Sequence, residues 1–430
     1  HRLAAQLAVR AGDAVRALTD AANCAQFMND SESAFELHLL AADRAGDGDT
    51  KATAIARAVE LAARFPVTFR TEIPVRRLRE LVDRATAAAD RNDPDVAARL
   101  ACAKAWTAGP ELLAPDPELA GAAVAAARAA GDPVLLSAAL DAARTVAVNA
   151  GHTRKAHEIT GERLALLDAL NPIEPHHAVE IDDAHGLGCL DAVAAGDLPA
   201  AGAAAGLVQG LPGDAVYLTA SKTIPALVLS GELDRAARLA EEMWESWRRA
   251  GRPPAFWMQA TAHFVALAHG LRGDRDNLRR WRERAADTEA FGHRAFQARL
   301  RPLAVFVDAR VAIHLGEFDR ADTIVGRVHG DTLTGRYLPF AHAAAAELAV
   351  VARLPDAAAR VAAAARTADD NDWAAACLLR AAARLDNDAE VLAEASLRWH
   401  AMGARFEHAC TQLLVPGHTP DTVGPFGARP

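Results

Sequence analysis

The sequence is poor in aromatic side chains, which make up 5% of its 430 residues and include only two Tyr. β-Sheets are usually rich in aromatic and β-branched residues, and no convincing run of alternating β-branched residues occurs here. The apolar half of the composition (51%) is mostly Ala with Leu and Val. Small side chains of this kind suit helices packed at close spacing, so the sequence predicts an all-α protein.

Cysteines are also few, and they are scattered singly. Their number is five, which is odd, and no two of them have CxxC spacing. A disulfide framework or a zinc ribbon would bring cysteines together at short intervals. We therefore expect reduced thiols in a cytoplasmic protein, at the positions Cys24, Cys102, Cys189, Cys377 and Cys410.

Long apolar runs and an excess of positive charge are both missing. No run of 18 apolar residues free of charge occurs, which argues against a membrane span, and no basic-then-apolar leader precedes the first helical pattern. The formal net charge is −9, which argues against coating DNA or an anionic membrane by electrostatics. We expect no membrane association and no direct nucleic-acid contact.

Recognisable catalytic motifs are missing as well. The sequence contains no GxxxxGK[ST] phosphate loop, no GxSxG nucleophile motif and no HExxH zinc motif. These absences predict a non-catalytic chain without a cofactor or a catalytic metal.

Helical periodicity dominates what is present. Segments such as 255–271 and 299–316 place apolar residues three and four positions apart, the spacing of one helix face. A turn of the form Gly–acidic–x–x–x–Ala recurs, most clearly at Gly231–Ala236 (GELDRA) and Gly316–Ala321 (GEFDRA). Gly can end a helix in the left-handed conformation, and acidic residues favour the start of the next helix. Weaker copies begin at Gly12, Gly46, Gly131, Gly196, Gly273 and, in degenerate form, Asn92.

GELDRA and GEFDRA resemble the turn between helix A and helix B of a tetratricopeptide repeat. The resemblance implies a right-handed α-solenoid of divergent tetratricopeptide-like helical hairpins. It places the small residue of helix A at Cys189, Ala266 and Ala309, and the Ala of helix B at Ala201, Ala236 and Ala321. Leu278 departs from that pattern, and the early aromatic of helix A is mostly missing.

A second resemblance covers nearly the whole chain. The Ala-rich irregular repeats and the segment 395–417 resemble the C-terminal region of large actinobacterial ATP-dependent LuxR-type transcription regulators, or of their cyclase and ATPase relatives. It implies that the chain, which opens at His1 within a helical pattern, belongs to a longer polypeptide with NTPase and DNA-binding modules. We expect less regular helical repeats in residues 1–170, tetratricopeptide-like repeats in 171–415 and a flexible tail in 416–430.

These features favour a non-catalytic segment that senses a small-molecule inducer or a peptide or protein partner. In the tetratricopeptide frame, certain helix A positions face the concave groove of the superhelix. Carried onto this sequence, they predict ligand contacts at Asp183, Ser221, His263, Phe306 and Arg310. The alternative is a stand-alone protein–protein interaction adaptor.

A cluster of Trp and Arg between residues 244 and 281 is a candidate partner surface. Trp and Arg dominate interface hot spots, and Arg over Trp gives cation–π attraction. We predict partner contacts at Trp244, Trp257, Arg279 and Trp281, with packing between helices as the alternative.

The densest polar cluster, residues 176–185, supports a third hypothesis. His176, Glu180 and Asp183 would share one helix face, and an imidazole with two carboxylates suits a divalent metal in a metal-dependent enzyme. The alternative is a helix start after Pro172 and Pro175, where acidic side chains offset exposed N–H groups.

Overall fold

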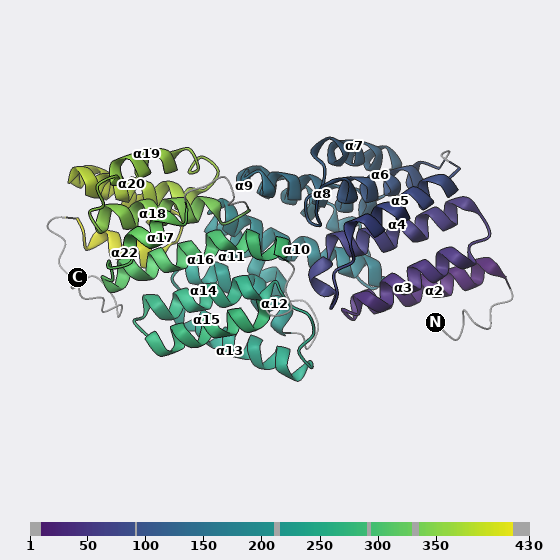
Figure 1. Cartoon of the computed structure of the whole chain (residues 1–430), viewed down its shortest axis with the longest axis horizontal. Coiled ribbons are helices and arrows are strands. Elements are labelled where there is room, and N and C mark those ends of the chain that lie inside the picture. The colour runs from purple at the N-terminus through teal and green to yellow at the C-terminus, as the bar shows by residue number, and fades with distance from the viewer. Residues whose placement is uncertain (1–9, 91–92, 210–215, 290–293, 329–334, 416–430) are drawn as a thin grey trace. The chain divides into compact units, whose positions relative to one another are not determined.

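The computed structural model describes residues 10–90, 93–209, 216–289, 294–328 and 335–415 (Figure 1). Every regular element within these ranges is an α- or 3₁₀-helix, so the predicted all-α class is confirmed. The predicted flexible tail, 416–430, and the degenerate repeat turn at Asn92 lie outside the described residues.

The chain forms two compact units. Unit 1 comprises residues 1–149 and 158–185, and unit 2 comprises residues 150–157 and 186–430. Helices α9 and α10 contribute residues to both units. The boundary expected between residues 170 and 171 falls within unit 1.

The helices up to α10 belong wholly or partly to unit 1. Their bounds are α2 (Ala11–Phe27), α3 (Ser31–Arg44), α4 (Gly48–Arg64), η1 (Pro66–Thr68), α5 (Val75–Ala88), α6 (Pro94–Ala108), α7 (Pro117–Ala130), α8 (Pro133–Asn149), α9 (Thr153–Leu164), η2 (Leu167–Ala169) and α10 (Pro175–Ala195).

The remaining helices belong to unit 2. Their bounds are α11 (Leu198–Gln209), α12 (Val216–Leu229), α13 (Leu233–Arg249), α14 (Met258–Leu271), α15 (Arg275–Glu289), α16 (Arg294–Leu315), α17 (Ala321–Gly326), α18 (Leu338–Val351), α19 (Ala357–Ala365), α20 (Asp372–Asp386), α21 (Ala389–Ala401) and α22 (Arg405–Gln412).

Within each unit, helices pack against their sequence neighbours and against the next helix but one. In unit 2, α12 contacts α13 and α14, α14 contacts α15 and α16, and α16 contacts α18, which contacts α20. In unit 1, α4 contacts α5 and α6, and α6 contacts α7 and α8. This is the contact pattern of stacked hairpins. The right-handed superhelix stays a prediction.

The predicted glycine turns are confirmed at most positions. Gly131, Gly196, Gly231, Gly273 and Gly316 all have φ between 68° and 80° and follow a helix. The prediction is wrong at Gly12, which lies inside the first turn of α2. Gly46 lies in a turn between α3 and α4 as predicted, but its φ is not positive.

Acidic residues after these glycines cap the following helix at four turns, as expected, whereas Glu232 makes no side-chain cap bond at the start of α13. Asp47 accepts a hydrogen bond from the Thr50 N–H at 2.8 Å, and Asp132 accepts one from the Val134 N–H at 2.8 Å. Asp197 and Asp274 accept from the N–H groups three residues ahead, at 3.0 and 3.1 Å. The side chains therefore satisfy donors that a helix start leaves unpaired.

Small side chains let the paired helices approach closely. Cys189, Ala266 and Ala309 have no exposed surface. At Gly270, a Cβ atom would lie 2.4 Å from the Val311 side chain. The backbone of α14 therefore packs directly against a side chain of α16 at this point. The Ala positions predicted for helix B, Ala201, Ala236 and Ala321, are also buried.

All five cysteines are free, as the sequence predicted. Among the helices of the described ranges, none combines the length and the apolar character that crossing a bilayer requires.

Candidate ligand-binding site

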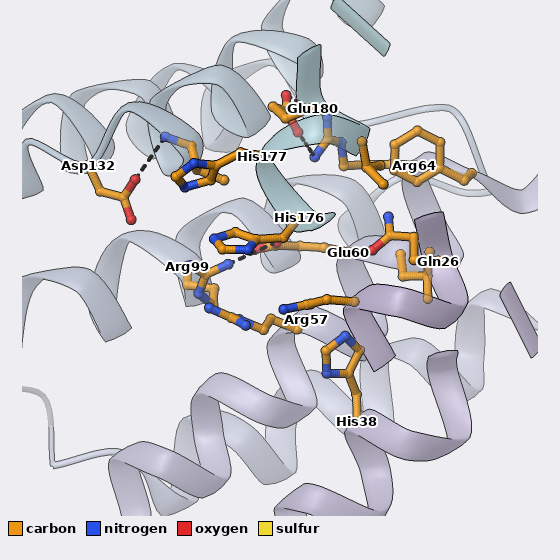
Figure 2. Close-up of a pocket in the computed structure, with 15 residues that line it drawn as sticks. Gln26, His38, Arg57, Glu60, Arg64, Arg99, Asp132, His176, His177 and Glu180 are labelled. Carbon is orange, nitrogen blue, oxygen red and sulfur yellow. Dashed lines mark hydrogen bonds and ion pairs between the residues drawn. The ribbon is translucent and has the colours of Figure 1, made fainter. Parts of the chain in front are cut away.

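Unit 1 contains a polar pocket, called here the unit 1 pocket, with a volume of about 110 Å³ (Figure 2). That volume holds several water molecules or one small ligand. Helices α2, α3, α4, α6, α8 and α10 and their flanking residues surround it. Its lining residues are Asn23, Gln26, His38, Arg57, Glu60, Leu61, Arg64, Phe65, Arg99, Asp132, Val134, His176, His177, Val179 and Glu180.

Helix α4 supplies one wall of the pocket. Arg57, Glu60, Leu61 and Arg64 are spaced three, four and seven positions apart, so they share one helix face. The rest of α4 is largely buried alanine with Ile and Val. The helix therefore anchors itself through its apolar faces and presents three ionisable side chains to the pocket.

The first turns of α10 supply the opposite wall. Pro175 begins this helix, and the missing N–H of proline is not needed at a first helical position. The backbone N–H of Asn171 donates to Nδ1 of His177 at 3.0 Å. Because Nδ1 accepts, the proton of the neutral His177 ring lies on Nε2. The rings of His176 and His177 contact each other with centroids 4.3 Å apart.

Glu180, in the pocket wall formed by α10, belongs to a dense network of ion pairs. Arg64 binds its two carboxylate oxygens in a bidentate pair at 3.1 Å, Arg163 donates to Oε1 at 2.6 Å, and Ser137 donates to Oε1 at 2.6 Å. Burial alone would raise the pKa of Glu180, but the charges of Arg64 and Arg163 outweigh it and lower the pKa to about 2. Glu180 is therefore ionised and fully engaged.

Asp183 and Asp141 complete this network. Asp183 accepts from Arg163 at 2.8 Å, and Asp141 accepts from Nε of Arg64 at 3.1 Å. The charges of these carboxylates and of Glu180 outweigh burial, so the pKa values of Arg64 and Arg163 are raised. Both arginines therefore remain charged, and carboxylates of the protein bind their guanidinium groups.

Glu60 and Arg99 form a much looser pair. Nη1 of Arg99 lies 3.4 Å from Oε2 of Glu60, while Oε1 of Glu60 has no hydrogen-bond partner among the described residues. Burial raises the pKa of Glu60, against the charges of Arg99, Arg64 and Arg57. The carboxyl group of Glu60 is thus under-satisfied in the structure.

Arg57 is the unpaired cation of the pocket. Its Nε is buried without a hydrogen-bond partner in the described part of the chain, and no carboxylate there forms an ion pair with it. In Figure 2 its side chain lies between those of His38 and His176. Burial and the charge of Arg99 lower the pKa of Arg57 to about 10, against smaller opposing effects of Glu60 and Asp132.

Two histidines beside Arg57 are neutral at physiological pH. Burial, with the charges of Arg57 and Arg99, lowers the pKa of His38 to about 3. Burial and His177 lower the pKa of His176. Nδ1 of His38 has no partner among the described residues. These rings offer hydrogen-bonding groups without adding charge.

The lining is mostly polar and charged. None of the lining residues is Ser, Cys, Thr, Lys or Tyr, so the walls hold none of the hydroxyl, thiol or amine nucleophiles used in covalent catalysis. Convergent polar groups with one unpaired guanidinium are the arrangement that orients a polar ligand.

The hypothesis of a divalent metal at residues 176–185 is not supported. Glu180 and Asp183 do share a face of α10, but they bind Arg64 and Arg163 in place of a metal ion. Across the part of the chain that the structure describes, no three or more His, Cys, Asp or Glu side chains are grouped to hold a metal.

Of the predicted ligand contacts, Asp183 lies in unit 1 and is bound by Arg163. Ser221 on α12 is buried and donates to the Leu218 carbonyl at 2.8 Å. His263 on α14 is half-buried, and burial lowers its pKa to about 4 although the charge of Asp308 opposes the shift.

The other two predicted ligand contacts are core residues of unit 2. Phe306 has no exposed surface and packs edge-on against Trp373, with ring centroids 5.2 Å apart. Arg310 is buried and binds Glu347 and Glu407 at 2.7 Å. Neither side chain is exposed to an open groove. Helix packing buries Phe306, and an ion network surrounds Arg310. None of the five predicted ligand residues lines the unit 1 pocket.

The predicted partner surface is largely packing between helices. Trp281 has no exposed surface and meets Trp244 edge-on, with centroids 5.9 Å apart. The guanidinium of Arg284 lies over both rings, 4.8 Å from the centroid of Trp244 and 4.3 Å from that of Trp281. Trp257 stacks on Tyr217 at 5.9 Å. Only Arg279 among the predicted partner contacts is fully exposed, beside Asp276, and its role in binding stays a prediction.

Sequence reasoning missed most of the unit 1 pocket. It identified His176 and Glu180, but not Arg57, Glu60 or Arg99. A signal was present, since Arg57, Glu60 and Arg64 interrupt an alanine-rich helix at the spacing of a single face. A scan against protein-family models and a search of the curated proteins find no match for the chain.

Proposed function

We propose that this chain is a non-catalytic, cytoplasmic sensing segment of a signalling or transcription regulator, and that the unit 1 pocket receives its small-molecule ligand. The observation that carries the proposal is Arg57, a cation without an ion-pair partner among the described residues, in the lining of a polar pocket. A purely structural cluster pairs its charges, because an unpaired buried charge destabilises the folded state.

The buried ion network of unit 2 gives the internal comparison. There Arg310 and Arg380 meet Glu347 and Glu407 at 2.6 to 2.8 Å. That network pairs both guanidinium groups with both carboxylates, although Nε of Arg310 has no hydrogen-bond partner among the described residues. The unit 1 pocket instead leaves a guanidinium and a carboxylate oxygen without hydrogen bonds, which is the state expected of a site that awaits a ligand.

The pocket also suits signal transmission. Its lining comes from six helices and extends from Asn23 to Glu180 along the chain. A ligand that contacts several helices favours the arrangement that it fits best, and it shifts an equilibrium by its difference in affinity for the two arrangements. The resemblance to helical regions of ATP-dependent regulators suggests that NTPase and DNA-binding modules receive this signal.

A thermal-shift screen of the chain against a panel of soluble metabolites tests the proposal. We expect at least one compound to raise the unfolding temperature in a concentration-dependent way, and we expect the substitution Gln26→Ala in the pocket wall to weaken that response. A chain that responds only to polypeptides, and to no small molecule, is the interaction adaptor instead.

A further inference from the structure

The lining of the unit 1 pocket has an unbalanced set of available charges. Among its carboxylates, Glu180 is engaged by Arg64, Arg163 and Ser137. Oδ1 of Asp132 accepts from the N–H groups of Val134 and Leu135 at the start of α8. Glu60 and Asp132 remain as acidic neighbours of Arg57 in the lining, but neither forms an ion pair with it among the described residues.

The two guanidinium groups of Arg57 and Arg99 are weakly compensated. Arg99 is held only by a 3.4 Å contact with Glu60, and Arg57 by no carboxylate among the described residues. The two arginines repel each other, and this repulsion contributes to the lowered pKa of Arg57. An anion between them would relieve the repulsion and satisfy their donors, because a guanidinium presents a planar fork that matches carboxylate and phosphate oxygens.

The remaining polar groups suit the same ligand. His177 can donate from Nε2, since Nδ1 accepts from the Asn171 N–H. Figure 2 places His176, Arg57 and Arg99 around the same space. The pocket therefore surrounds that space with donors.

Size limits the class of ligand. A cavity of about 110 Å³ admits a molecule of a few heavy atoms, whereas drug-sized ligands occupy pockets of roughly 300–1,000 Å³.

We propose that the unit 1 pocket binds a small anionic metabolite through its carboxylate or phosphate group, with Arg57 and Arg99 as the residues that hold the anion. This inference rests on the proposed function, since it names the class of ligand that the sensing site takes.

The test uses isothermal titration calorimetry and thermal unfolding of the full 430-residue chain at pH 7 and constant ionic strength. The probes are inorganic phosphate, succinate and succinamide, the neutral analogue of succinate. We expect phosphate or succinate to bind saturably and to raise the unfolding temperature by about 3 °C at ten times its Kd. We expect no response to succinamide. A response to phosphate alone assigns a phosphate ligand, and a response to succinate alone assigns a carboxylate ligand.

Arg57→Met is the decisive variant, because it removes the unpaired charge without orphaning a carboxylate. We expect it to weaken anion binding at least about tenfold and to keep or raise the unfolding temperature of the unliganded chain. Loss of binding would then not come from unfolding. Arg84→Met, which removes an exposed arginine of α5 outside the pocket, is the matched control and should bind as the original chain does.

The outcomes separate the two proposals. Anion binding that Arg57→Met leaves unchanged, or no saturable binding of either anion, overturns the anionic ligand. If a neutral metabolite from the panel then binds and Gln26→Ala weakens its binding, the sensing function stands with a different ligand. If only a polypeptide binds, both proposals fail.

Discussion

Arg163 and Glu180, on α9 and α10, meet at 2.6 Å with the arginine side chain completely buried. This contact fixes the position of the Glu180 carboxylate in the wall of the unit 1 pocket. It also links α9 to the first turns of α10. The same guanidinium reaches Asp183 at 2.8 Å. A single side chain thus binds two acids that Arg64 also contacts, at 3.1 and 3.6 Å.

Arg163→Met should destabilise unit 1 severely. Removing one partner of a buried ion network leaves uncompensated charge, which costs about 3–5 kcal/mol. Urea denaturation followed by circular dichroism measures this loss, and hydrogen exchange at the amides of α9 and α10 locates it. Arg128→Met is the control, because Arg128 pairs with Glu162 at the surface and should cost less than about 1 kcal/mol. Equal losses in the two variants would contradict a structural role for Arg163.

Acidification should destabilise the chain through His38. Its pKa is about 3 when folded and 6.5 in its ordinary state. Between these values the unfolded chain binds a proton that the folded chain does not, so stability falls as pH drops from 6.5 towards 3. At pH 5 this one group accounts for about 2 kcal/mol relative to pH 7.5.

His38→Gln should reduce that pH dependence in urea titrations at pH 7.5 and pH 5. Some dependence remains, because burial also lowers the pKa values of other histidines, including His263. His152→Gln changes an exposed histidine and should leave the dependence as it was. If stability depends on pH in His38→Gln as it does in the original chain, His38 binds protons in the folded chain as readily as in the unfolded chain.

Glu347 should govern the response of unit 2 to stronger acid. Burial raises its pKa, but Arg380 and Arg310 outweigh this and lower it to about 2. A carboxylate with a depressed folded pKa contributes its full stability above 4.5, and the contribution disappears as pH falls through 2. Between pH 5 and pH 3 the loss is about 2 kcal/mol.

Glu347→Gln should therefore be less stable at pH 7 by about 3–5 kcal/mol and should lose less stability between pH 5 and pH 3. Denaturation curves at the three pH values test both statements. Glu394→Gln, at an exposed pair with Arg398, should behave as the original chain does. If the stability of Glu347→Gln falls between pH 5 and pH 3 as steeply as that of the original chain, the low pKa assigned to Glu347 is refuted.

Gly231→Ala should be more damaging than Gly273→Ala. Both glycines have left-handed φ, at 80° and 72°, where an L side chain costs about 1–2 kcal/mol. At Gly231 the added Cβ would also lie 2.8 Å from the backbone nitrogen of Phe406, whereas at Gly273 it meets nothing within 4 Å. Thermal unfolding of the two variants compares the strain with and without the clash. Equal shifts would mean that α22 moves away from Gly231 at no cost.

Local rules explain what the sequence predicted well. Helix periodicity, left-handed glycines and acidic caps act over a few neighbouring residues, so Gly231, Gly316 and Asp132 could be placed from their immediate surroundings. Gly12 shows the limit, because nothing local distinguishes a glycine in a first helical turn from one that ends a helix.

The groove predictions failed at Phe306 and Arg310 for a different reason. A repeat frame assigns a position to a face, but it does not say whether another element covers that face. Here Trp373 from α20 packs on Phe306 and Glu407 from α22 binds Arg310, and both come from far along the chain.

The sequence by itself determined the all-α class, the helical hairpins and the face of α10 that carries His176, Glu180 and Asp183. Only the tertiary structure decided what that face binds. Arg64 meets Glu180 across 116 positions of sequence, and such pairing depends on the packing of α4 against other helices, which no local pattern records. The same packing leaves Arg57 without an ion pair among the described residues, because Glu180 is held by Arg64 and Arg163.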